Sequence, residues 1–281
     1  MSEHQLGDPV KRNRAPEDEE NGERYRAPAL DKGLDILEAL AATEVGLTQA
    51  EIAKALDRSP SEIYRMLDRL VRRGYVVRTD AERYELSLKL FALAHQHPPR
   101  RRLVSLAIPL MRGFVQAAEQ SCHLAVFDRG RVVVIAQLDA PTYWGVAIRV
   151  GAHVGLLGTG SGHVLLAFQS PAERAMMLAE HEAAVGEQPA PPDLEARLAA
   201  LRTRGYERME SQQTRGITNI AAPVLGPDGS AIASFSCAFV AQVDPSRPGI
   251  EVALARLTEA AAALTALAGG QMLARNGGVR P

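Results

Sequence analysis

The chain has 281 residues, 46% of them hydrophobic and 23% charged, with a formal net charge of −1. This length suits two globular domains, and the composition excludes a fibrous or wholly disordered protein. Two cysteines provide no disulfide framework, and neither a signal peptide nor an apolar stretch of membrane-spanning length is visible. We therefore expect a cytoplasmic protein without a membrane partner.

The N-terminal residues 1–26 are rich in charge, Pro, Asn and Gly, which is typical of a disordered tail. The first folded helix is expected from about residue 28 to residue 42. Leucines at three- and four-residue spacing mark its expected buried stripe: Leu30, Leu34, Leu37 and Leu40.

Residues 48–86 carry the pattern of a winged helix-turn-helix. Thr48 is a candidate N-cap, and Glu51 completes a capping box. After a polar turn at residues 57–59, a second helix opens at Pro60, a residue suited to a first helical turn. Its inward side is expected to be Ile63, Met66, Leu67 and Leu70. Residues 75–78 and 83–86 read as the two strands of a wing.

The second helix is expected to read DNA. Between Arg58 and Arg78, six arginines face two acids, a local excess of +4 that the whole-chain charge hides. Such a basic face contacts phosphates, while short polar side chains near a helix start reach base edges in the major groove. The candidate DNA-binding residues are Ser59, Ser61, Tyr64, Arg65, Arg69 and Arg78. The alternative is a solvated amphipathic helix in an ordinary domain.

A further apolar helix is expected at residues 87–95. It has too little core of its own, so Leu88, Phe91 and Leu93 are candidates for contact with a partner chain. The segment His97-Pro98-Pro99 is expected to end this helix and to mark the domain boundary. The expected organisation is therefore a DNA-binding domain at 27–86, a linker helix at 87–99, a second domain at 100–270 and a tail at 271–281.

The second domain reads as hairpins flanked by helices. Helices are expected at about 103–120, 161–168, from Ser170, from Pro192 to Gly205 and at 250–268. Strands are expected at 123–127, 131–138, 143–150, 206–211, 217–225 and 231–240. This order predicts an antiparallel sheet of the α+β class.

The glycine-rich segment Gly158-Thr159-Gly160-Ser161-Gly162 precedes a helix, where free backbone amides favour an anion. The spacing does not match a nucleophile elbow, a dinucleotide fingerprint or a phosphate loop. An anion or carbonyl cradle and a plain tight turn both remain open. No histidine or cysteine spacing indicates a metal, and Cys122 and His123 should point to opposite faces of a strand. We expect no cofactor and no enzyme activity.

Taken together, the segments LDKGLDILEAL, TQAEIAKALDRSPSEIYRMLDRLVRRGYV, VGAHVGLLGTGSGHVLLAF and RGITNIAAPVLGPDGSAIASFS resemble the IclR family of bacterial transcriptional regulators over about residues 28–268. The resemblance implies a GAF-like effector domain and a dimer joined through the DNA-binding domains and linker helices, often paired into a tetramer. It also implies that the effector is held by Gly160, Ser161, Ile217, Asn219 and Ser236.

The resemblance also implies differences from the small-acid-binding members of that family. Those members have an acidic residue where this chain has Met209, a cysteine where it has Asn219 and a serine where it has Ala238. A pocket with fewer polar anchors suits an apolar or aromatic acid, or a related carbonyl compound. Trp144 is a further candidate for the pocket wall. The function expected is a regulator of transcription, repressor or activator, that binds a palindromic operator and responds to this effector. The alternatives are a ligand-independent DNA-binding protein with a degenerate sensor, or an enzyme with an appended DNA-binding module.

Overall fold

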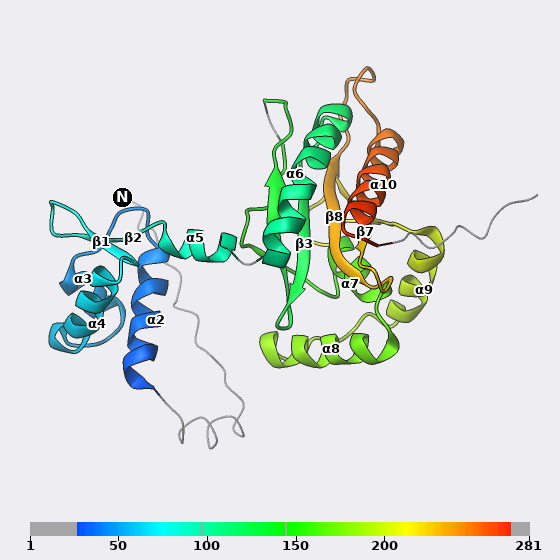
Figure 1. Ribbon diagram of the computed structural model, residues 1–281. Coiled ribbons are helices and arrows are strands. Elements are labelled where there is room, and N and C mark those ends of the chain that lie inside the picture. Colours follow the sequence, from blue (N-terminus) through cyan, green and yellow to red (C-terminus); the bar gives the residue numbers. More distant parts are fainter. Residues whose placement is uncertain (1–26, 97, 144, 271–281) are drawn as a thin grey trace, which may run out of the picture. The chain divides into compact units, whose positions relative to one another are not determined.

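The computed structural model describes residues 27–96, 98–143 and 145–270, and the chain divides between residues 97 and 98 into two compact units (Figure 1). The expected tails at 1–26 and 271–281 lie outside the described residues, as does Trp144. Within the described ranges, no helix is both long and apolar enough to cross a membrane.

The N-terminal unit is a winged helix-turn-helix followed by a short helix, which confirms the predicted fold. Its elements are α2 (Pro28–Ala41), α3 (Gln49–Ala55), α4 (Pro60–Arg72), β1 (Val76–Arg78), β2 (Tyr84–Leu86) and α5 (Lys89–Gln96). Strands β1 and β2 pair antiparallel, with Val76 opposite Leu86, and form the wing.

Capping boxes set the start of both helices of the helix-turn-helix. The Glu51 carboxylate accepts from the Thr48 amide at 2.8 Å, which confirms the predicted box at α3. A second box, not recognised from the sequence, begins α4: the Glu62 carboxylate accepts from the Ser59 amide at 3.0 Å and from its hydroxyl at 2.9 Å. These bonds, the backbone one above all, lower the pKa of Glu62 to about 2. The first turn of α4 is therefore held in place by its own sequence.

The core of this unit runs through Ile36, Leu40, Ile52, Ile63 and Leu67, all buried. The expectation that Leu30 and Leu34 are buried is wrong, because their side chains are 61% and 47% exposed. The apolar stripe of α2 continues past the part of the helix that packs against the rest of the unit. Helical spacing shows that such a stripe exists but not how much of it is covered.

The C-terminal unit is a six-stranded antiparallel sheet with helices on both faces, as predicted for the α+β class. The sheet order is β5-β4-β3-β8-β7-β6. The strands are β3 (Cys122–Asp128), β4 (Arg131–Leu138), β5 (His153–Val154), β6 (Glu207–Glu210), β7 (Ile217–Leu225) and β8 (Ala231–Val240). The helices are α6 (Pro98–Ala118), α7 (Gly160–Ala167), α8 (Pro171–Val185), α9 (Leu194–Arg204) and α10 (Ile250–Leu267).

Alternation along the strands divides this unit into two cores. Leu124 and Phe235 point into a core with α6 and α10, which lie side by side on one face of the sheet (Figure 1). Ala125 and Ala221 belong to the core on the other face, with α7, α8 and α9. Because residues of opposite parity face opposite sides of a strand, one side of β3, β7 and β8 is directed toward the start of α7.

Two sequence expectations for this unit are corrected. Helix α6 begins at Pro98, not near residue 103, because proline is tolerated in a first helical turn and here opens the helix. The expected strand at 143–150 is wrong in its described residues, and the edge strand is the two-residue β5, which pairs with Val132 and Val133. The apolar alternation of Val146 and Ile148 has another cause, because both line a cavity.

Candidate nucleic-acid interface and ligand cavity

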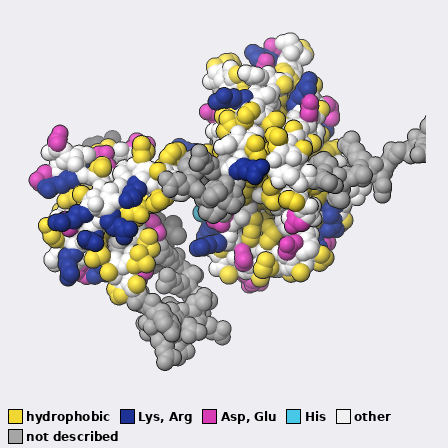
Figure 2. Space-filling model, in the orientation of Figure 1, with side chains coloured by type: hydrophobic (Ala, Val, Ile, Leu, Met, Phe, Trp, Pro, Cys, Tyr) yellow, Lys and Arg dark blue, Asp and Glu magenta, His cyan; other side chains and the backbone are white. Residues whose placement is uncertain are grey.

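Helix α4 presents a polar and basic surface to solvent. Its N-terminal Ser59, Ser61, Tyr64 and Arg65 are exposed, and 56% of Tyr64 is accessible. Lys and Arg side chains gather on the visible face of this unit (Figure 2). The structure thus places four of the six sequence-predicted residues, Ser59, Ser61, Tyr64 and Arg65, around the N-terminal end of α4, whereas Arg69 lies in its last turn and Arg78 on the wing.

The arginines of this surface differ in how they are paired. Arg72 pairs with Asp68 at 2.9 Å, and Arg78 on the wing pairs with Glu82 at 2.7 Å. Arg65 and Arg69 have no ion-pair partner among the residues that the structure describes, and Arg69 is exposed on the same helix. Since no internal ion pair has to break, Arg65 and Arg69 are the better placed to contact a phosphate or a base.

In the C-terminal unit, hydrogen bonds of the Thr159 side chain to neighbouring backbone groups hold the glycine-rich segment in one conformation. Thr159 caps α7, and its hydroxyl accepts from the Gly162 amide at 3.1 Å and donates to the Gly155 carbonyl at 2.6 Å. A Cβ at Gly162 would lie 2.0 Å from the carbonyl oxygen of Leu156, so only glycine fits there. As the first two residues of α7, Gly160 and Ser161 have amides with no helical carbonyl to donate to.

These amides border a cavity of about 220 Å³ between α7 and the sheet. It brings together five predicted residues: Gly160, Ser161, Ile217, Asn219 and Ser236. Its other lining residues are His123, Val146, Ile148, Val154, Thr159, Ser211, Gln213, Thr214, Ile220, Ala221, Cys237 and Ala238. No Lys or Arg lines it among the described residues. The site is therefore a small, partly apolar cavity whose polar groups are neutral donors and acceptors.

A chain of hydrogen bonds crosses the cavity floor. His123 Nε2 lies 3.2 Å from Ser161 Oγ, which donates to Ser236 Oγ at 2.9 Å, and Ser236 Oγ lies 2.8 Å from Ser234 Oγ. The Ser161 proton is engaged by Ser236, so His123 Nε2 must donate to Ser161 and its Nδ1 remains an acceptor. Burial lowers the pKa of His123 to about 4, so its imidazole is neutral at neutral pH.

This geometry bears on the alternative of an enzyme. A histidine does lie beside Ser161, which local sequence spacing did not reveal, but here it donates to the hydroxyl instead of taking its proton. Cys122 is buried among α6 and α10, on the opposite face from His123, and burial raises its pKa to about 12. The Cys122 thiol therefore lacks the thiolate character that a cysteine nucleophile needs. Among the described residues, no three His, Cys, Asp or Glu side chains gather as a metal site.

Met209, which was expected at the effector, lies elsewhere. It lines a second cavity of about 410 Å³ between α9 and β6, together with Arg204, Glu207 and Arg208. Met209 does pair with Asn219 across β6 and β7, but the structure does not place it among the residues lining the first cavity.

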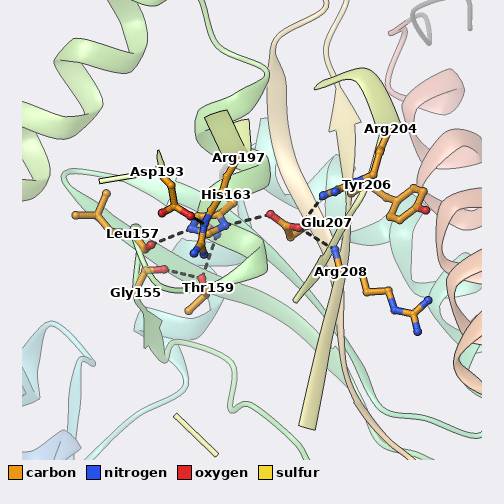
Figure 3. A network of polar contacts seen from close by, with 11 residues as sticks. Gly155, Leu157, Thr159, His163, Asp193, Arg197, Arg204, Tyr206, Glu207 and Arg208 are labelled. Carbon is orange, nitrogen blue, oxygen red and sulfur yellow. Dashed lines mark hydrogen bonds and ion pairs between the residues drawn. The ribbon is translucent and has the colours of Figure 1, made fainter. Parts of the chain in front are cut away.

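Sequence reasoning missed two histidines of this region. His123 reaches the cavity because β3 pairs with β8 in a register that sets it opposite Ser236, a long-range pairing with no local signal. The sequence assigns His163 no role, because its partner Glu207 lies 44 positions further along the chain. The structure buries it completely and joins it to Glu207 (Figure 3).

Most of the chain matches two domain models of one protein family. Residues 29–80 match the model of the IclR helix-turn-helix domain, and residues 96–266 match that of the bacterial transcriptional regulator IclR C-terminal domain. The chain belongs to the IclR family. Its relatives include the HTH-type transcriptional regulators BhcR of Paracoccus denitrificans, 31% identical over 74% of this chain and 76% of that protein, and KdgR of Escherichia coli, 30% identical over 74% and 80%.

Solved structures share the fold of this IclR-family protein. An IclR homolog complexed with 4-hydroxybenzoate from Microbacterium hydrocarbonoxydans superimposes with a TM-score of 0.70 at 24% identity, covering 85% of this chain and 98% of that one. HmgR of Pseudomonas aeruginosa gives a TM-score of 0.68 at 23% identity, over 84% and 97%. The protein is a DNA-binding regulator of transcription with a C-terminal effector domain, and the named relatives are regulators rather than enzymes.

Proposed function

We propose that this IclR-family regulator changes its affinity for operator DNA when a small, apolar or aromatic organic acid, or a related carbonyl compound, binds the cavity lined by Gly160, Ser161, Asn219 and Ser236. The observation that carries the proposal is that one cavity is lined by four donor-bearing residues: Gly160 and Ser161 at the start of α7, Asn219 with its side-chain amide and Ser236 with its hydroxyl. Such donors suit one carboxylate or carbonyl group.

The cavity limits the size and character of the ligand. Its volume of about 220 Å³ lies below the range of about 300–1,000 Å³ that drug-sized ligands occupy. Val146, Ile148, Val154 and Ile217 supply apolar wall, and no described cation is present for a second carboxylate. We therefore favour a monoacid with one ring or a short chain. The fold neighbour described with 4-hydroxybenzoate binds a molecule of this kind.

On the DNA side, we propose that a homodimer, or a pair of dimers, reads a short imperfect palindrome, with one α4 in each half-site. Exposed apolar side chains on the N-terminal unit support a partner-covered surface: Leu88 is 80% exposed, Phe91 60% and Leu93 44%. Sedimentation of the full chain tests this proposal. A monomer at micromolar concentration that binds one half-site tightly would overturn it.

The effector proposal is tested by a thermal-shift screen of aromatic and aliphatic monoacids, because a ligand of the native state raises the unfolding temperature. Asn219→Ala and Ser236→Ala should each lose a hydrogen bond to the best acid, at about 0.5–1.5 kcal/mol for a neutral bond and up to about 3 for a charged one. Thr218→Ala is the matched control, because Thr218 is on the same strand but donates to Glu210 at 3.1 Å, outside the cavity.

Two outcomes would contradict the proposal. One is an acid that stabilises the protein yet binds both alanine variants as tightly as it binds the parent, which would place the ligand elsewhere. The other is a chain that binds its operator and responds to no acid, which would support the ligand-independent alternative.

A further inference from the structure

A buried ion pair joins the helix that follows the glycine-rich segment to strand β6, and neither of its residues lines the first cavity. His163 of α7 is fully buried, with Nδ1 3.1 Å from Glu207 Oε2 and Nε2 2.8 Å from the carbonyl oxygen of Leu157 (Figure 3). A carboxylate and a carbonyl oxygen only accept hydrogen bonds, so both ring nitrogens must donate. The geometry thus requires His163 to be a doubly protonated, positively charged imidazolium.

Glu207 is arranged as the matching anion. Its side chain is buried on β6 and also accepts from Arg204 Nη2 at 3.0 Å and from the Arg208 amide at 2.9 Å. Burial by itself raises the pKa of Glu207, but the hydrogen bonds from His163 and Arg208 outweigh it, and the net shift is downward. The pair is therefore ionised and has its hydrogen bonds made, the condition under which a buried charge is tolerated.

The other charged groups facing the pair come from α9 and from β6. Asp193, the N-cap of α9, pairs with Arg197 at 2.6 Å, and Arg204 ends that helix (Figure 3). Arg208 of β6 pairs with Glu251 at 2.6 Å. Asp193, Arg197, Arg204 and Arg208 line the second cavity, of about 410 Å³, together with Glu207. Within the described residues, the Glu207 carboxylate is the group that His163 Nδ1 contacts.

The pair joins the effector segment to the edge strand β6 through the contact of His163 Nδ1 with Glu207. Nε2 of His163 holds the Leu157 carbonyl, before the glycines, while its ring is carried by α7, after them. Between these points Gly160 packs on β6 and β7, because a Cβ there would lie 3.6 Å from Glu207 Cγ and 3.7 Å from Asn219 Cβ. The positions of the Gly160 and Ser161 amides thus depend on the His163–Glu207 pair and on the Thr159 cap.

We infer that His163 and Glu207 are positioning residues of the effector site: the charged imidazolium clamps the Leu157 carbonyl to β6 and so sets the donors of Gly160 and Ser161 for the ligand. This role rests on the proposed function of the cavity. Loss of either partner leaves a buried charge without its counterpart, and the segment must move.

The first test needs no effector. Full-length protein with 15N-labelled histidine should show, at pH 7, one ring with both nitrogens protonated, and this signal should vanish in His163→Gln. The backbone amide resonances of Gly160 and Ser161 should shift in Glu207→Gln and stay in place in Glu210→Gln, a matched change on the same strand at an exposed position. A neutral-tautomer pattern for His163, or unmoved amides in Glu207→Gln, would overturn the inference whether or not the cavity binds an acid.

The second test measures binding of 4-hydroxybenzoate by calorimetry. Glu207→Gln and His163→Gln should each weaken it about tenfold, the change that about 1.4 kcal/mol of misplaced hydrogen bonding produces. The double variant should be no weaker than the poorer single variant, because the two residues act as one unit. Glu210→Gln should remain within about twofold of the parent, which is the spread expected of a surface substitution.

Operator binding without acid checks that each variant is folded. If His163→Gln fails this check, His163→Lys replaces it. Because lysine keeps a positively charged donor, His163→Lys should bind 4-hydroxybenzoate more tightly than Glu207→Gln does. Parent-like affinity in a folded Glu207→Gln variant contradicts the inference. Absence of binding by the parent protein counts against the proposed effector class, and the amide resonances then decide the positioning role alone.

Discussion

Replacement of Gly162 by alanine should destabilise the effector domain specifically. The new Cβ would lie 2.0 Å from the Leu156 carbonyl oxygen and 2.6 Å from its carbon, and these are backbone atoms of a fully buried residue. A flexible side chain is not available to move aside. Overpacking of this kind costs about 1–3 kcal/mol and occasionally more, against a gain of up to about 1 kcal/mol for alanine in a helix. Because the contact is this close and made with backbone, we place the cost near the top of that range, about 3 kcal/mol, which leaves a net loss of about 2 kcal/mol.

The matched control is Gly113→Ala in α6. Gly113 is exposed, and no atom lies within 4 Å of its added Cβ, so alanine should stabilise the helix by about 0.5–1 kcal/mol. Thermal unfolding of each variant is followed by scanning calorimetry. The two alanine variants should move the midpoint in opposite directions, with Gly162→Ala lower by about 4–8 °C. A Gly162→Ala protein that unfolds with or above the parent would refute the close-approach argument.

Three further predictions concern the helix cap, the DNA surface and the pH dependence of stability. Thr48→Ala should cost the N-terminal unit about 1 kcal/mol of unfolding free energy, measured by denaturant titration, because it removes the cap of α3. Arg65→Ala should weaken specific operator binding by about 1–3 kcal/mol. Arg72→Ala should weaken it less, because the Arg72 side chain is already paired with Asp68. Equal losses of affinity in an anisotropy titration would contradict this ranking. Burial lowers the pKa of His123 to about 4 in the folded protein, against about 6.5 in the unfolded chain. The resulting contribution to stability, on the order of 3 kcal/mol, is therefore fully present above pH 6.5 and is lost as the pH falls from about 6.5 to 4. His123→Gln should flatten stability against pH in that window, and an unchanged slope would show that His123 titrates normally.

The sequence predicted elements best where a local signal and a periodic pattern coincided. Strands β7 and β8 have the expected bounds, because a Gly-Pro-Asp-Gly turn separates two long apolar runs. The capping box at Thr48 likewise marked the start of α3. By contrast, apolar spacing at Leu30 and Leu34 carried no information on whether a neighbouring element covers them.

The site was predictable only in part, for a physical reason. The predicted cavity residues lie on the glycine segment and on two adjacent strands, which recognisable motifs identify. His123 enters through the pairing of β3 with β8, and Glu207 meets His163 across 44 positions of the chain. These contacts depend on sheet order and strand register, which are tertiary properties. Trp144 stays a prediction, because it lies outside the described residues.

The central claim is that an acid bound in the cavity near Ser161 and Asn219 controls binding to DNA by another domain. The most direct measurement is fluorescence anisotropy of a palindromic site selected from random DNA by the protein itself, titrated with the acid that most raises the unfolding temperature. We expect a saturable change in DNA affinity that requires more acid in Asn219→Ala and is unaltered in Thr218→Ala. An affinity for DNA that stays constant across saturating acid in the parent protein would contradict it.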